Sequence, residues 1–367
     1  MSAAAPPGMI HRRRLLQCAG LALMPASAAV RALEGATPAA QPTGDDALER
    51  ARAWMARQPC IDIHGHLGGS GPSRPVHDFA AFKASGLSAA CLSLVSDKPV
   101  LGVSRGHILA RREPLPGELH QAMQERFDFA DAAIREQGLR RILCADDLRQ
   151  VAPQSPPGLI LATEGADFLD GQAERLEPLH ARGLRHLQLV HYRADNGIGD
   201  IQTEAPQAGG ATAWGLELVR ACQQLRIVVD VAHATFETVQ QVARISTAPL
   251  VLSHTALVRA PGPRARSIGE AHARLVADTG GVVGLWTNAA SFSSPAALAR
   301  GAVAMAEAIG VDHVAIGSDM NGLLHPLLSS YADFPQLAAA LLAQFSEAEA
   351  GQILGGNYLR VFQQVVG

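Results

Sequence analysis

The segment Ile227-Val-Val-Asp-Val-Ala-His233 is a short apolar run that ends in a histidine, and Pro249-Leu-Val-Leu-Ser-His254 repeats the pattern. Short runs that are apolar throughout and rich in Val, Ile and Leu are typical of parallel strands buried on both faces. Each histidine is therefore expected at the carboxyl end of a strand. Ligand-type side chains at several such ends converge on one place when the sheet closes into a barrel.

The same pattern recurs along most of the chain. Further apolar runs lie at 60–63, 88–95, 159–163, 186–190, 281–286 and 313–317, with segments of helical composition between them. At or just past the ends of these runs stand His64, His66, Glu164, His191 and Asp319. Eight strands that alternate with helices predict an α/β fold of the (β/α)8 TIM-barrel type, of the metal-dependent amidohydrolase kind. A doubly wound open sheet is the alternative.

The first residues have the features of a targeting segment. Arg12-Arg13-Arg14 precedes an apolar stretch, and Ala26-Ser27-Ala28 is suited to signal cleavage, so residues 1–32 are expected to be a twin-arginine-type signal peptide. Residues 33–44 are rich in Ala, Pro, Gly and Thr and are expected to form a linker. Residues 45–367 are then a single metallohydrolase domain, periplasmic or secreted.

Charge and hydropathy narrow the choice of partners. The formal net charge is −3 at pH 7, and removal of the three signal arginines would make the mature protein more acidic. An acidic surface argues against nucleic acid or an anionic membrane as partner. The apolar stretch near the N-terminus is too short to remain as a membrane anchor, so none is expected in the mature form.

The strand-end residues predict a metal site. His64 and His66 are two residues apart, so on a continuing strand they face the same side. Glu164 follows a very apolar run, where an unpaired carboxylate is costly. Each of these residues, and His233 and His254, would by itself be an ordinary loop or core residue, but their joint occurrence at strand ends predicts a metal-dependent hydrolase.

Imidazole and carboxylate ligands without cysteine suit zinc better than manganese or iron. A glutamate between two ions would leave room for a shared hydroxide that attacks a carbonyl carbon. The pattern therefore favours a two-metal site centred on Glu164.

The chain resembles the membrane (renal-type) dipeptidase family, zinc peptidases of family M19, over about Cys60 to Phe362. The matching motifs come in the same order: Asp62-Ile-His64-Gly-His66, Thr163-Glu164-Gly165, Asp230-Val-Ala-His233, Ser253-His254-Thr, Arg266-Ser-Ile and Gly317-Ser-Asp319. The resemblance implies two zinc ions per chain, one held by His64, His66 and Glu164 and the other by Glu164, His233 and His254. It also suggests a homodimer.

The resemblance further implies roles for the remaining strand-end residues. His191 would stabilise the oxyanion above the substrate carbonyl. Arg266 would pair with the substrate carboxylate, although Arg264 is close enough in sequence to take that role. Asp319 would contact the free amine and move a proton to the leaving nitrogen. Independently of the resemblance, the loop that begins at His191 is expected to line the pocket. Tyr192, Arg193 and Asn196 either set specificity there or are ordinary loop residues, and Tyr192 is the one predicted to contact the substrate.

Two positions depart from the family. His66 stands where the family usually has Asp, which removes a negative charge from the first metal site, and Asn321 replaces a common Asp. The leading hypothesis is a dinuclear zinc dipeptidase that cleaves dipeptides with free amine and carboxylate by a metal-bridging hydroxide. The alternatives are an amidohydrolase that acts on another amide, a lactam or a lactone, and a zinc-containing binding protein without activity.

Overall fold

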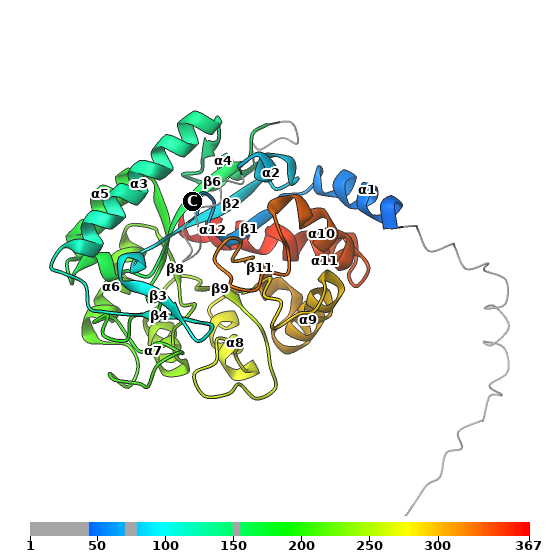
Figure 1. Cartoon of the computed structure of the whole chain (residues 1–367). Coiled ribbons are helices and arrows are strands. Elements are labelled where there is room, and N and C mark those ends of the chain that lie inside the picture. Colours follow the sequence, from blue (N-terminus) through cyan, green and yellow to red (C-terminus); the bar gives the residue numbers. More distant parts are fainter. Residues whose placement is uncertain (1–43, 70–78, 150–154) are drawn as a thin grey trace, which may run out of the picture. The chain divides into compact units, whose positions relative to one another are not determined.

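Figure 1 shows the computed structural model, which describes residues 44–69, 79–149 and 155–367. The contacts of these residues fall within one unit, Gly44–Gly367. The expected signal peptide at 1–32 and the linker at 33–44, apart from Gly44, lie outside the described residues. Among the helices that are described, none has the length and apolar character needed to cross a membrane.

All eight predicted strands are present, with ends shifted by a few residues at most. They are β1 (Ile61–Gly65), β2 (Ala89–Val95), β6 (Gly158–Glu164), β7 (Leu184–Gln188), β8 (Val228–Asp230), β9 (Val251–Thr255), β10 (Val282–Leu285) and β11 (Val314–Ile316). They form one parallel sheet in this order, and the short β5 (Arg140–Arg141) also pairs with β6.

The two outer strands of this sheet meet, which decides between a barrel and an open sheet. A parallel bridge joins Gly65 to Met320, just past the end of β11. The amide of His66 donates to Met320 O at 2.8 Å, and the amide of Asp319 donates to His64 O at 2.9 Å. The prediction of a (β/α)8 barrel is therefore confirmed, and the open-sheet alternative is wrong.

Helices surround the sheet (Figure 1). They are α1 (Gly44–Met55), α2 (Phe79–Ala84), α3 (Glu118–Gln137), α4 (Ala145–Arg149), α5 (Leu176–Ala181), α6 (Ala213–Gln224), α7 (Phe236–Ile245), α8 (Glu270–Ala277), α9 (Pro295–Ile309), α10 (Phe334–Leu342), α11 (Glu347–Gly351) and α12 (Asn357–Val365). The side chains of Thr212, Thr235 and Ser294 cap α6, α7 and α9 by accepting a backbone N–H. Such caps satisfy amides that the helix itself leaves without a partner.

A hairpin that sequence patterns did not predict follows β2. Strands β3 (Leu101–Ser104) and β4 (His107–Ala110) pair antiparallel as a separate two-stranded sheet. The two residues between them, Arg105 and Gly106, have φ of 49° and 78°. Positive φ at both positions is the requirement of the tight hairpin turns whose twist matches that of the strands.

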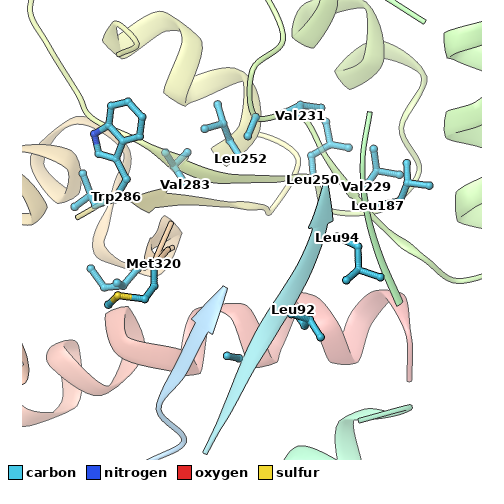
Figure 2. Close-up of a cluster of buried hydrophobic side chains, with 14 of the residues drawn as sticks. Leu92, Leu94, Leu187, Val229, Val231, Leu250, Leu252, Val283, Trp286 and Met320 are labelled. Carbon is cyan, nitrogen blue, oxygen red and sulfur yellow. The ribbon is translucent and has the colours of Figure 1, made fainter. Parts of the chain in front are cut away.

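The core gathers the apolar residues of the strands in two clusters. Figure 2 shows part of the larger one, which includes Leu92 and Leu94 of β2, Leu187 of β7 and Leu252 of β9. In the smaller cluster, α12 places Tyr358 and Phe362 among residues from strands around the sheet. Burial of these strands on both sides explains why most of their residues are apolar.

Candidate active site

The structure brings all seven strand-end residues to one place at the carboxyl ends of the strands. His64 lies in β1, Glu164 ends β6 and His254 lies in β9, whereas His66, His191, His233 and Asp319 follow the ends of β1, β7, β8 and β11. All seven side chains are buried. Convergence of side chains from separate strands is what closure of a parallel barrel produces.

The carboxylate of Glu164 is the centre of this cluster. Its Oε1 lies 3.4 Å from His64 Nε2, 3.3 Å from His233 Nε2 and 3.6 Å from His254 Nε2. Its Oε2 lies 3.2 Å from His191 Nε2 and 3.6 Å from His66 Nε2. Five imidazole rings from four strand ends therefore direct Nε2 at one carboxylate.

Two of these residues have an unusual backbone conformation. His233 has φ of 67° and Asp319 has φ of 55°, in the left-handed region that side chains with a Cβ rarely adopt. Hydrogen bonds hold both in place: Gln202 N donates to His233 O at 2.7 Å, and Asp319 N donates to His64 O at 2.9 Å. Strain of this kind is concentrated at functional sites because the surroundings must hold it.

The rings of three histidines are oriented through Nδ1. His66 Nδ1 donates to Ser93 O at 2.8 Å, and His254 Nδ1 lies 2.9 Å from Ser253 Oγ. His64 Nδ1 lies between Ser93 Oγ and Ser253 Oγ, at 3.2 and 3.3 Å. Contacts of this kind at one ring nitrogen leave Nε2 for a ligand. The sequence offered a signal for Ser253, which directly precedes the predicted ligand His254. It offered none for Ser93, which is not adjacent to a predicted ligand and was missed.

Burial and neighbouring charges set the protonation of the cluster. Burial raises the pKa of Glu164, but the charges of His191 and His64 outweigh it and hold that pKa well below its usual range. Burial, with repulsion from Arg266, lowers the pKa of His233 well below the usual value, and burial with the charges of His64 and Arg266 does the same for His254. The site therefore contains an ionised carboxylate and two neutral imidazoles.

The donor atoms fit divalent metal ions. Among the described residues, three groups have ligand atoms that all lie within 4.8 Å of one another: His64, Glu164 and His254; His64, His66 and Asp319; and Glu164, His191 and His233. His64 Nε2 is buried without a hydrogen-bond partner, and the Nε2 atoms of His233 and His254 lie 3.0 Å apart. Nitrogen and oxygen donors of these types suit zinc.

A cavity of about 540 Å³ opens over the cluster. Glu164, His66, His191, His233, His254 and Asp319 line it, together with Tyr192, Arg266 and residues of the β3–β4 hairpin. Arg266 NH2 donates to His254 Nε2 at 3.0 Å, and its guanidinium lies 5.6 Å from the centre of the Trp286 ring. Arg264 is exposed and does not line the cavity, so Arg266 is the arginine placed to meet a substrate.

In the loop after β7, Tyr192 lines the cavity, whereas Arg193 and Asn196 form contacts that hold the loop in place. Tyr192 lines the cavity and shares a hydrogen bond with Arg266. Arg193 pairs instead with Asp167, at 2.9 Å, and with Glu113, at 2.7 Å. Asn196 donates to backbone carbonyls of its own loop. Neither Arg193 nor Asn196 lines the cavity, so of the two alternatives the interpretation as loop residues holds for both.

Two acidic residues support the site from outside the cavity: Asp97, to which the sequence assigned no role, and Asp62, which was expected to steady the first strand or a histidine. Asp97 Oδ1 accepts a hydrogen bond from His191 Nδ1 at 2.6 Å. Burial lowers the pKa of His191, but the charges of Asp97 and Glu164 prevail and raise it to about 9. Asp62 accepts from Ser318 N at 2.8 Å and Ser318 Oγ at 2.6 Å, which ties the ends of β1 and β11 together.

A barrel whose strand ends carry imidazole and carboxylate donors around a cavity defines the class of metal-dependent hydrolases. The chain belongs to the membrane dipeptidase family, peptidase family M19, whose sequence model matches residues 74–366. By family it is a metal-dependent dipeptidase. The matched range begins after His64 and His66, so the departure at His66 lies outside it.

Individual relatives agree with this family. The chain is 28% identical over 242 residues to an uncharacterized protein in the pqqA 5′ region of Klebsiella pneumoniae. This alignment covers 62% of this chain and 89% of that protein. It is 27% identical over 216 residues to the dipeptidase aclJ of Aspergillus oryzae, with 56% of this chain and 51% of that protein covered. The chain thus spans about half the length of that curated dipeptidase.

The fold is also that of solved structures. The probable dipeptidase PvdM of Pseudomonas aeruginosa superimposes with a TM-score of 0.74 and 18% identity, over 88% of this chain and 99% of that one. An identity this low establishes a shared barrel fold and nothing finer.

Proposed function

We propose that the protein uses two zinc ions to hydrolyse dipeptides that have a free amine and a free carboxylate. The observation that carries this proposal is the position of the Glu164 carboxylate, within 3.6 Å of five imidazole Nε2 atoms. The ionised carboxylate and four of these five imidazoles offer oxygen and nitrogen donors of the kind that zinc binds.

In this proposal His64, His66 and Glu164 would hold one ion, and Glu164, His233 and His254 would hold the other. Two zinc ions at these residues would lower the pKa of a water molecule and polarise the substrate carbonyl. The Nδ1 contacts of His64, His66 and His254 orient their rings for this task. His233 Nδ1 is buried without a partner, so its orientation depends on its backbone conformation.

Three residues at the cavity would bind the substrate and take part in its hydrolysis. The guanidinium of Arg266 would pair with the substrate carboxylate, for which its planar donors are suited. His191, held through Nδ1, would donate from Nε2 to the oxygen that becomes negative in the transition state. Asp319 would contact the free amine and carry a proton to the leaving nitrogen. Tyr192 supports Arg266 through their shared hydrogen bond.

His66 is the observation that favours a second substrate class. An imidazole in place of a carboxylate makes the metal site more positive, and hence better suited to a substrate that is itself negatively charged or lacks a free amine. An amide, lactam or lactone other than a dipeptide is the alternative within the same hydrolytic chemistry. We also propose, from the sequence of residues 1–32, that the enzyme is exported and acts in the periplasm.

The test is a metal assay paired with a substrate panel. The zinc-loaded protein is offered dipeptides with an L- or D-residue at the second position, the same dipeptides acetylated at the amine or amidated at the carboxylate, and a set of lactams and lactones. We expect about two zinc ions per chain and turnover of the free dipeptides only. Turnover confined to lactams, lactones or blocked amides would support the alternative, and turnover of nothing would contradict both.

A further inference from the structure

Asp97 occupies the carboxyl end of β2, a strand end to which no catalytic or ligand role has been given. Its side chain is fully buried. One oxygen, Oδ1, lies 2.6 Å from His191 Nδ1, and the other, Oδ2, accepts a hydrogen bond from Tyr192 N at 3.1 Å. Both oxygens of one carboxylate are therefore directed at two consecutive residues of the loop after β7.

The geometry fixes which atom of His191 faces the cavity. A carboxylate only accepts hydrogen bonds, so Nδ1 of His191 carries the hydrogen in this contact. The opposite ring atom, Nε2, then points toward Glu164 Oε2, 3.2 Å away, and toward the cavity. The contact with Tyr192 N prevents the loop from rotating the ring out of this position.

The charge of Asp97 has no other counterpart. Among the described residues, it forms an ion pair with His191 and with no lysine or arginine. A buried carboxylate with so few donors is costly for stability, which argues against a role in the fold alone. Its neighbour in space, Asp167, is a contrast: it is also buried, but it pairs with Arg193 and accepts from Ser96 Oγ at 3.1 Å.

We infer that Asp97 is a positioning residue for His191, which holds the ring so that Nε2 can stabilise the negative oxygen that forms during hydrolysis. This inference rests on the proposed dipeptidase function. Asp97 does not line the cavity itself, so it acts on the reaction through the two loop residues that it holds, by its side-chain contact with the His191 ring and its contact with the backbone of Tyr192. Partners of this kind at one ring nitrogen affect activity about 10- to 100-fold when they are removed.

A double-mutant cycle tests this dependence. Asp97→Asn, His191→Gln and the double variant are compared with the wild type for kcat, KM and zinc content. We expect Asp97→Asn to lower kcat roughly 10- to 100-fold with little change in KM or in zinc content. The double variant should be no slower than His191→Gln alone, because the two residues act as one unit. If the two losses multiply, or if Asp97→Asn turns over like the wild type, the inference is wrong.

Asp167→Asn is the matched control, because it removes a buried acid beside Asp97 that contacts no imidazole. We expect it to change thermal stability without the loss of kcat.

A second measurement does not depend on activity. The NMR spectrum of protein labelled with ¹⁵N in histidine should contain a slowly exchanging Nδ1–H signal that disappears in Asp97→Asn and in His191→Gln. If that signal is missing in the wild type, the inference fails. If it is present in a wild type that cleaves no dipeptide, the proposed function fails instead.

Discussion

His66 Nε2 lies 3.0 Å from Asp319 Oδ1, although the two residues are 253 positions apart in the sequence. The contact joins the first and the last strand of the barrel. Gly322 keeps the space around it open, because a Cβ there would stand 2.1 Å from Asp319 Oδ1 and 2.5 Å from His66 Cδ2. The His66 imidazole thus has a carboxylate partner from the segment that follows β11, the strand on which β1 closes the barrel.

Replacement of Glu164 tests the centre of the site. Because one carboxylate faces five imidazoles, we expect Glu164→Ala to lose both its zinc and its hydrolytic activity. Zinc per chain after gel filtration and turnover of a dipeptide are the two measurements. Glu177→Ala, an exposed acid on α5, is the control and should retain both. A fully active, zinc-loaded Glu164→Ala protein would contradict the two-metal proposal.

Asp319→Asn separates proton transfer from metal binding. If Asp319 contacts the substrate amine and carries a proton to the leaving nitrogen, the Asp319→Asn variant should retain its zinc and have a kcat about 10²- to 10⁴-fold below that of the wild type. The same carboxylate lies within ligand distance of His64 and His66, so zinc content must be measured beside kcat. Loss of one zinc ion per chain would place Asp319 among the ligands.

Arg266 and Arg264 form a natural pair of variants. Loss of a charge-assisted hydrogen bond to the substrate carboxylate corresponds to about 1.5–3 kcal/mol, so we expect Arg266→Ala to raise KM roughly 10- to 100-fold. Arg264→Ala should leave KM unchanged, because that side chain is exposed outside the cavity. An unchanged KM in Arg266→Ala would move carboxylate recognition to another residue.

Replacing His66 by Asp should couple the stability of the fold more strongly to zinc. In His66→Asp, a third carboxylate joins Glu164 and Asp319 without a metal, and we expect this repulsion to lower the free energy of unfolding by on the order of 1–3 kcal/mol. Bound zinc relieves the repulsion, so the rise in Tm on zinc addition should exceed that of the wild type. His66→Asn has no charge and should show no such increase. Equal shifts in all three proteins would refute the electrostatic argument.

His272 should make stability depend on pH. Burial, with repulsion from Arg266, lowers its pKa from 6.5 to about 4, and its Nε2 is buried without a hydrogen-bond partner. His272 therefore becomes protonated below about pH 6.5 in the unfolded chain, but only below about pH 4 in the folded protein. The free energy of unfolding falls as the pH drops through this interval, because the unfolded chain binds the additional proton. Between pH 7 and pH 5 the linkage amounts to about 2 kcal/mol.

Between pH 7 and pH 5, we expect the free energy of unfolding of His272→Leu to fall by about 2 kcal/mol less than that of the wild type. Denaturant unfolding at both pH values, with a chelator in every sample, measures this difference without a contribution from metal release. Identical pH slopes for the two proteins would show that His272 is not the group responsible.

The sequence by itself determined the strands and the polar residues at their ends, and it favoured a barrel over an open sheet without deciding between them. Apolar runs such as 159–163 reflect burial on both sides, which is a local property, and a polar residue at the end of such a run is visible without any knowledge of pairing. Asp97 could have been found by the same rule, because it follows the run 88–95, but a single aspartate beside a serine has no distinguishing feature.

Only the tertiary structure decided which residues meet. Arg264 and Arg266 are indistinguishable by pattern, and the path of one loop exposes the first and places the second over the cavity. The tight hairpin β3–β4 depends on two positive φ values that sequence patterns do not single out. The contacts of His66 with Asp319 and of Asp97 with His191 join strands that are distant in the chain. Such contacts follow from closure of the sheet, which short-range hydrophobic patterns do not encode.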